Sequence, residues 1–193
     1  MIIKIKRSIL CYFLLAVSFI YSQTDNNKNN HTLRIEIPEV ALINVQSSSN
    51  TSIKFGGGSV VEAGQALKIN QTDDSIWINY SSIVGTQTDP SRNVTIQIAE
   101  GTIPNGLDLF VKAGKDSGHG DGKMGTPASQ MQLLTASPLD IVTKIGSPYT
   151  GVGPNKGHNI AYTLKLKEDK DSYGQLNFDE TTTLVINYTL SDN

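Results

Sequence analysis

The chain has 193 residues, with 16 Lys and Arg against 18 Asp and Glu, a formal net charge of −2 and a single cysteine. The charges are scattered, so the sequence shows neither the basic patch of a nucleic-acid-binding protein nor an acidic tail. One cysteine cannot form an intrachain disulfide, so the fold depends on its apolar core.

The first 22 residues have the pattern of a secretory signal peptide. Lys4, Lys6 and Arg7 form a basic start, an apolar run follows, and small Ser22 precedes the expected cleavage point. The run is shorter than the about 20 apolar residues that a membrane-spanning helix needs. Cleavage would remove the only cysteine and leave 13 basic against 18 acidic residues, a net charge of −5. We therefore expect a secreted or cell-surface protein with no membrane span in the mature chain. The Ile-, Lys- and Asn-rich composition suggests a bacterial source, so the expected location is the bacterial periplasm or exterior.

The mature chain is predicted to be one domain behind a short tether. Residues 23–30 are polar and Asn-rich, which is typical of a disordered segment, and residues 31–193 have the length of a single domain. The first strand is predicted at Thr32–Ile37, where apolar and polar residues alternate until Pro38. Its inward residues would be Leu33, Ile35 and Ile37.

Two alternating runs between Arg92 and Gly114 predict a β-hairpin. The runs flank Pro104-Asn105-Gly106, which supplies the fixed φ of proline and the tolerance of positive φ that a chain reversal needs. The inward residues of the two runs are Val94, Ile96 and Ile98, then Leu107, Leu109 and Val111.

The rest of the chain also predicts short strands with turns between them. Asp73-Asp74 indicates a turn before a strand, and Pro127–Leu134 is the only segment after the signal peptide where a short helix fits the pattern. Irregular strand spacing and long loops favour an antiparallel two-sheet β-sandwich, Ig-like or jelly-roll-like, over a closed barrel. Further strands are predicted within 40–45, 76–80, 131–135, 141–145, 160–166 and 184–190. The predicted core contains Val94, Ile96, Ile98, Leu107, Leu109, Val111, Tyr162, Leu164, Ile186 and Tyr188.

The segment 120–125 matches the dinucleotide-binding pattern G-x-G-x-x-G, with Asp140 twenty positions after Gly120. That motif works only inside a parallel βαβ unit, and nothing else in the sequence indicates an α/β fold. We interpret the segment as a glycine-rich loop and predict no cofactor.

The same loop carries weak candidates for calcium binding, Asp116 and Asp121, with His119 between them. A single loop supplies too few oxygen ligands, and the spacing is not that of an EF-hand. Zinc is not favoured either, because His31, His119 and His158 are far apart in the sequence and no cysteine accompanies them. We predict no metal site.

Nothing in the sequence predicts an enzyme. The G-x-S-x-G pattern is absent, and His158 has no partners that the sequence identifies. Several carboxylates are available, but no pair of them stands out as a general acid and base.

An aromatic pair is the one surface feature that suggests a ligand. Trp77 is expected to point outward beside Asn79, and Phe110 is out of phase with the inward residues of its run. If the two strands were neighbours, these rings could form a platform for a sugar or a partner protein; the alternative is that a loop covers them.

The signal peptide, the cysteine-free sandwich and a final strand near the end of the sequence resemble secreted bacterial proteins of fimbrial or adhesin type. The resemblance implies a non-enzymatic surface or extracellular structural protein. The alternative is an extracellular glycan- or ligand-binding module that uses Trp77. Because a strand on a tether can pair with the edge of another molecule, self-assembly through Thr32–Ile37 is a further expectation.

Overall fold

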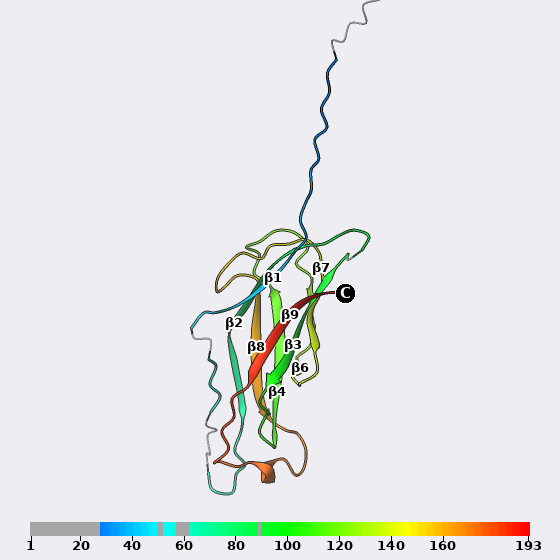
Figure 1. The fold of residues 1–193 in the computed structure, drawn as a ribbon. Helices are drawn as coiled ribbons and strands as arrows, with labels where there is room; N and C mark the ends of the chain where they lie inside the picture. Colours follow the sequence, from blue (N-terminus) through cyan, green and yellow to red (C-terminus); the bar gives the residue numbers. More distant parts are fainter. Residues whose placement is uncertain (1–27, 50–51, 57–61, 89) are drawn as a thin grey trace, which may run out of the picture. The chain divides into compact units, whose positions relative to one another are not determined.

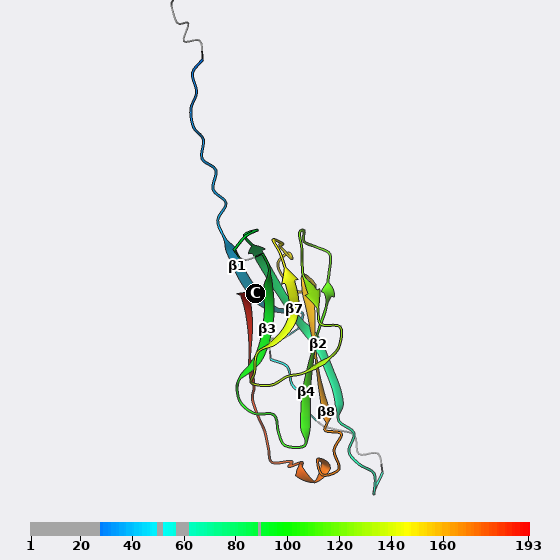
Figure 2. The same ribbon diagram turned by 90° about the vertical axis from the view of Figure 1, so that its right-hand side faces the viewer.

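The computed structural model describes residues 28–49, 52–56, 62–88 and 90–193. The predicted signal peptide and residues 23–27 of the predicted tether lie outside the described residues. The chain divides into two units, Met1–Ile37 and Pro38–Asn193. The second unit is an all-β fold of two antiparallel sheets that pack against each other, which confirms the predicted sandwich (Figures 1 and 2).

The first sheet has the strand order β1-β2-β8-β4-β6, and the second has the order β5-β7-β3-β9. Among the described residues the only helical segment is the short 3-10 turn η1, Tyr173–Gln175, so Pro127–Leu134 contains no helix. The strands are β1 Val40–Ser47, β2 Asn70–Ile83, β3 Arg92–Glu100, β4 Leu107–Asp116, β5 Thr126–Pro127, β6 Gln132–Leu133, β7 Leu139–Ile145, β8 His158–Leu166 and β9 Val185–Asp192.

The predicted hairpin between Arg92 and Gly114 is wrong. Both strands exist, and the turn at Pro104 forms with a bond from the Leu107 amide to the Pro104 carbonyl (3.2 Å). However, β3 pairs with β7 and β9, whereas β4 pairs with β8 and β6. The connection therefore passes from one sheet to the other. Alternation gives each strand an apolar face, but two such faces can meet across a core as well as lie side by side in one sheet.

The predicted first strand at Thr32–Ile37 is also wrong, because no strand forms in residues 28–37. Its expected inward side chains are 75 %, 80 % and 74 % exposed at Leu33, Ile35 and Ile37. Alternation predicts an extended segment with two unlike faces, but it does not provide the neighbouring strand that completes a sheet.

The predicted turn at Asp73-Asp74 is instead an irregularity inside the long strand β2. The pairing with β8 shifts register between Asp73 and Ile76. The Asp73 carboxylate accepts bonds from the amide (3.0 Å) and hydroxyl (2.6 Å) of Ser75. Such local side-chain bonds favour a turn, but here they stabilise a bulge, and the strand continues past it.

The core lies between the two sheets and contains most of the predicted residues. Leu164, Ile186 and Tyr188 are only partly buried at its margin, and Leu107 is partly exposed. The predicted residues that are buried are Val94, Ile96, Ile98, Leu109, Val111 and Tyr162. The buried apolar residues outside that core list are Ile76, Ile78, Tyr80, Ala113, Leu134, Ile141, Val142, Ile145 and Ile160.

Candidate functional site

The structure separates the two rings of the predicted aromatic platform. Trp77 lies on β2 and Phe110 on β4, and β8 lies between these strands. Trp77 pairs with Asn159 of β8, and Phe110 pairs with Thr163. The two rings are thus four residues apart along β8, roughly 13 Å, as well as two strands apart. They do not form one platform.

The third residue of that group, Asn79, has a structural role. Its side chain is buried, and its amide nitrogen donates to the Lys156 carbonyl (2.7 Å) while its oxygen accepts from the Gly153 amide (2.9 Å). These bonds hold the loop that leads into β8. The ring of Phe110 on β4 is partly covered by Lys165 of β8, whose ammonium lies 5.6 Å from the ring centre.

The carboxylates of the glycine-rich loop bind their own backbone. Asp116 accepts from the Gly118 amide, and Asp121 from the Gly122 amide, each at 2.7 Å. Within the described part of the chain, no three His, Cys, Asp or Glu side chains gather as metal ligands would. The loop approaches a neighbouring segment closely, since a side chain at Gly120 would overlap the backbone of Tyr149.

His158 is the first residue of β8 and is fully buried. Its Nδ1 lies 2.8 Å from the Gly114 carbonyl, which can only accept, so Nδ1 carries a proton. Its Nε2 lies 2.7 Å from the hydroxyl of Tyr80, and the two rings are stacked. Burial, and then the charge of Asp116, raise the pKa of Tyr80. His158 therefore belongs to a buried polar network with Tyr80 and the Gly114 carbonyl.

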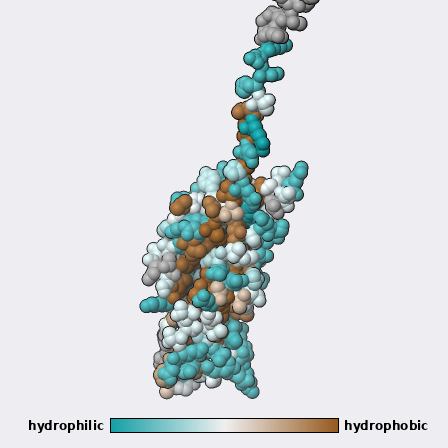
Figure 3. All heavy atoms as spheres, in the orientation of Figure 1, coloured by the Kyte–Doolittle hydropathy of each residue, from teal (hydrophilic) through white to brown (hydrophobic). Residues whose placement is uncertain are grey.

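One flank of the sandwich leaves apolar side chains incompletely covered. We call it the open side, and it is formed by the inward faces of the two edge strands β1 and β9. Figure 3 shows apolar residues gathered in the upper middle of this face, where Figure 1 places β1 and β9. The residues of the open side are Ile43, Val45, Ile186, Tyr188 and Leu190.

The inward rows of neighbouring strands show where the cover is missing. Val94 and Ile96 of β3 are fully buried, whereas their partners on β9, Leu190 and Tyr188, are only partly buried. On β1, Val45 is paired with fully buried Ile78, yet it remains 38 % exposed. Residues that lie directly opposite each other on paired strands share a face of the sheet, so Val45, Tyr188 and Leu190 point inward. They are exposed because the opposite sheet does not fully cover them.

Two contacts between the sheets close parts of this flank. The hydroxyls of Tyr162 on β8 and Tyr188 on β9 form a hydrogen bond across the core. Burial raises the pKa of Tyr162 to about 12, and burial together with Tyr162 raises the pKa of Tyr188 well above its usual value. The second contact is made by Arg92, at the end of the open side where β1 begins and β9 ends.

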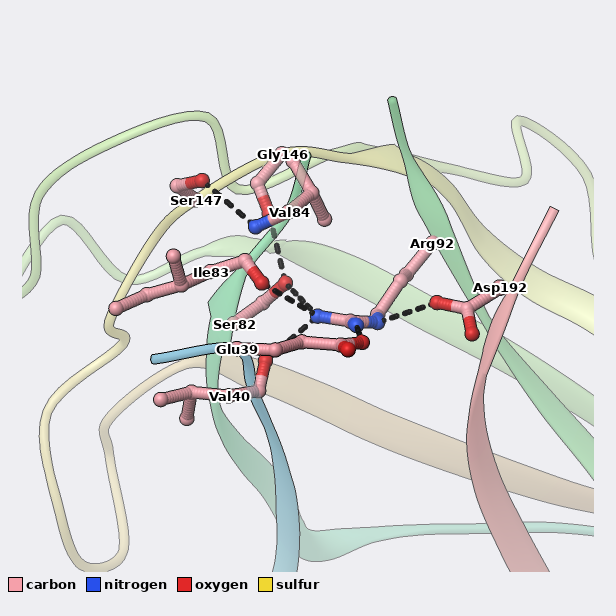
Figure 4. Close-up of polar contacts among 9 residues, drawn as sticks. All are labelled: Glu39, Val40, Ser82, Ile83, Val84, Arg92, Gly146, Ser147 and Asp192. Atoms are coloured by element: carbon pink, nitrogen blue, oxygen red, sulfur yellow. Dashed lines mark hydrogen bonds and ion pairs between the residues drawn. The ribbon is translucent and has the colours of Figure 1, made fainter. Parts of the chain in front are cut away.

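Arg92 is a buried arginine that connects three strands (Figure 4). Its Nε donates to Asp192 of β9 (2.7 Å). Its Nη1 donates to the carbonyls of Val40 (2.6 Å) and Ile83 (3.1 Å), at the start of β1 and the end of β2. Its Nη2 donates to Glu39. All three guanidinium nitrogens are therefore used, and the two sheets are fixed to each other at this end.

The sequence analysis did not identify Arg92, although one signal was present. Arg92 and Asn93 are polar residues that stand directly before the strongly alternating apolar run of β3. A charged residue at the start of so apolar a strand is unusual, and this was the signal. Its partners Glu39 and Asp192 lie 53 and 100 residues away in sequence. Only the folded chain brings them together.

The comparisons with known proteins provide no relative. None of the protein-family models, curated proteins or solved structures compared with this chain matches it. In the part of the chain that the structure describes, no helix has the length and apolar character needed to cross a membrane.

Proposed function

We propose that this chain is a secreted, non-enzymatic structural protein of adhesin-like type that assembles by adding strands between copies. The observation that carries the proposal is the exposed alternating segment Thr32–Ile37. Three large aliphatic side chains lie on one face of its pattern and are about three-quarters exposed. Its polar side chains Arg34 and Glu36 form an ion pair with each other (3.1 Å).

Edge strands give the proposal its physical basis. A strand at the edge of a sheet has one row of amide and carbonyl groups without a neighbouring strand, and an extended peptide can bind there. In this sandwich β1 and β9 are long edge strands, and the open side next to them is apolar. Burying a large aliphatic side chain is worth about 1.5–3 kcal/mol, so three of them could contribute substantially to association.

The proposal is tested by the mass of the mature chain in solution. The chain starting at Gln23 should form oligomers in analytical ultracentrifugation as its concentration rises. A variant with Leu33→Ser, Ile35→Ser and Ile37→Ser should remain monomeric, as should a chain that starts at Glu39.

A matched control changes the polar residues of the same segment. Arg34→Ser with Glu36→Ser leaves the apolar row intact and should associate like the unchanged chain. The proposal fails if the unchanged chain stays monomeric at the highest concentration that can be reached, or if the control and the apolar variant behave alike.

The glycan-binding alternative has less support from the geometry, because Trp77 and Phe110 lie on strands that are not adjacent. Quenching of the Trp77 fluorescence by a panel of polysaccharides is the measurement that would favour it.

A further inference from the structure

We infer that His158 is a buried imidazolium with a proton on each ring nitrogen, and that this charge holds the glycine-rich loop against the sandwich in a pH-dependent way. The loop is the segment 117–125, which joins β4 to β5. The inference is independent of the proposed function, because it concerns the interior of a single copy. It rests on the donors and acceptors around the ring and on a buried carboxylate oxygen beside it.

The hydrogen bonds of His158 require a proton on both ring nitrogens. Its Nδ1 lies 2.8 Å from the Gly114 carbonyl, which can only accept, so Nδ1 donates. Its Nε2 lies 2.7 Å from the hydroxyl oxygen of Tyr80. That hydroxyl has a single hydrogen and donates it to the Met124 carbonyl. Nε2 must therefore donate to the Tyr80 oxygen, which gives the ring its second proton and a positive charge.

A neutral ring would break this chain of bonds. With a bare Nε2, the one hydrogen of Tyr80 would have to serve both Nε2 and the Met124 carbonyl, and one of these buried acceptors would lack a donor. Such an unpaired buried group is unfavourable. Burial, and then the charge of Asp116, raise the pKa of Tyr80, so its hydroxyl keeps the hydrogen that it donates.

Asp116 supplies the opposite charge. It lies directly opposite His158 in the pairing of β4 with β8, so the two side chains share a face of the sheet. Its Oδ2 accepts from the Gly118 amide, whereas its Oδ1 is buried and has no hydrogen-bond partner. A buried carboxylate without compensation is costly, and a positive ring nearby reduces that cost. A charged His158 thus accounts for the two donor nitrogens and for the unpartnered oxygen.

Other charges around the ring are exposed to water or already paired. Among the described residues, the titratable groups that face the ring are Tyr80 of β2 and Asp116 of β4. Arg92, which bonds Ser82 further along β2, has its charge matched by Glu39 and Asp192. The remaining ionisable side chains on the neighbouring loops and strand ends are exposed or partly exposed, so solvent screens them. They are Lys115, His119, Asp121, Lys123, Lys144, Tyr149 and Lys156.

The same network fixes the glycine-rich loop at both of its ends. Asp116 binds the Gly118 amide just after β4, and Tyr80 binds the Met124 carbonyl just before β5. When the ring releases its Nε2 proton to water, Tyr80 can satisfy only one of its two acceptors, and Asp116 loses its counter-charge. Loss of this proton should therefore loosen residues 117–125 while the two sheets stay paired.

The sign of the pH dependence follows from the extra proton. A histidine in the unfolded chain loses its proton near the ordinary pKa of about 6.5. Above that pH the folded state holds one proton more than the unfolded state, so folding becomes less favourable as the pH rises. Between about pH 6.5 and 8.5 the equilibrium constant for unfolding should rise by up to about tenfold per pH unit. Urea denaturation measures this constant, and a value that does not rise contradicts the inference.

Nuclear magnetic resonance of the chain starting at Gln23, labelled with nitrogen-15 in histidine, tests the charge directly. His31→Gln and His119→Gln replace the two exposed histidines, so that the remaining ring signal is that of His158. At about pH 7.5 a histidine in water is mostly neutral. We expect His158 to carry protons on both ring nitrogens at this pH. A bare Nε2 would overturn the inference.

Two matched variants test the role of Asp116. Asp116→Asn removes the counter-charge, so His158 should lose its second proton at a lower pH than in the unchanged chain. The control is Asp121→Asn, an exposed carboxylate of the same loop that also accepts from a backbone amide (2.7 Å), and it should leave the titration of His158 unchanged. Equal shifts in the two variants would show that Asp116 is not the counter-charge.

Hydrogen exchange tests the effect on the loop. After correction for the direct effect of pH on exchange, the amides of residues 117–125 should lose protection as His158 is deprotonated. The amides of residues 94–98 in β3 serve as the control and should keep theirs. Constant protection of the loop through the titration would show that the charge does not hold it.

Discussion

The Nε of Arg92 donates a 2.7 Å hydrogen bond to Asp192, and this bond connects the first residue of β3 to the last residue of β9. The same guanidinium also reaches Glu39 and the backbone of β1 and β2. One buried side chain thus fixes the end of the open side where the two sheets would otherwise separate.

Replacing Arg92 should therefore be costly. Arg92→Met keeps much of the side-chain volume but leaves the carbonyls of Val40 and Ile83 without this donor, and we expect a loss of about 2–4 kcal/mol in the free energy of unfolding. The control is Arg34→Met, which removes an exposed ion pair worth at most about 1 kcal/mol. Urea denaturation measures both. Equal effects at the two positions would mean that Arg92 does not hold the sheets together.

Substitutions in the core should lower the free energy of unfolding more at fully buried positions than at the partly buried positions of the open side. Ile96→Ala at a fully buried site should cost about 2–5 kcal/mol, while Thr95→Ala on the opposite face should cost under about 0.5 kcal/mol. Ile186→Ala on β9 should fall between them in the monomer, because its side chain is only partly buried. A loss at Ile186 as large as that at Ile96 would contradict an open side.

Stability should fall in alkaline solution because buried tyrosines keep their protons in the folded state. The pKa of Tyr162 is about 12 when folded, against an ordinary value of 10.0. Above pH 10 the unfolded state loses this proton first, so the free energy of unfolding should decrease by up to about 1.4 kcal/mol per pH unit until about pH 12. Tyr162→Phe should make the decline shallower. Denaturation curves between pH 9 and 12 measure the slope, and an unchanged slope in the variant would contradict the assignment.

Calcium should have no effect on the glycine-rich loop. Asp116 Oδ2 and Asp121 Oδ1 accept from backbone amides two and one residues further along the chain, and within the described residues no three His, Cys, Asp or Glu side chains gather as metal ligands would. The melting temperature of the unchanged chain should be the same with and without millimolar calcium. A rise that disappears in Asp116→Ala with Asp121→Ala would show that the loop is a calcium site.

The sequence by itself determined most of the strands and the fold class. Alternation is a local property, so the inward residues of β3, β4, β8 and β9 could be read without knowing any partner. The turn at Pro104 was equally local, because proline and glycine restrict the backbone directly. For the same reason Leu109 and Tyr162 were placed correctly in the core.

Tertiary structure decided which strands are neighbours, and hence every feature of the candidate site. A period of two gives a strand two unlike faces but does not specify which strands lie beside it. The sequence therefore could not show that β3 and β4 belong to different sheets or that β8 separates Trp77 from Phe110. Nor could it show that Thr32–Ile37, although it has the alternating pattern of a strand, does not form one. The burial of Arg92 depends on groups about 50 and 100 residues away, and such contacts exist only once the sheets have packed.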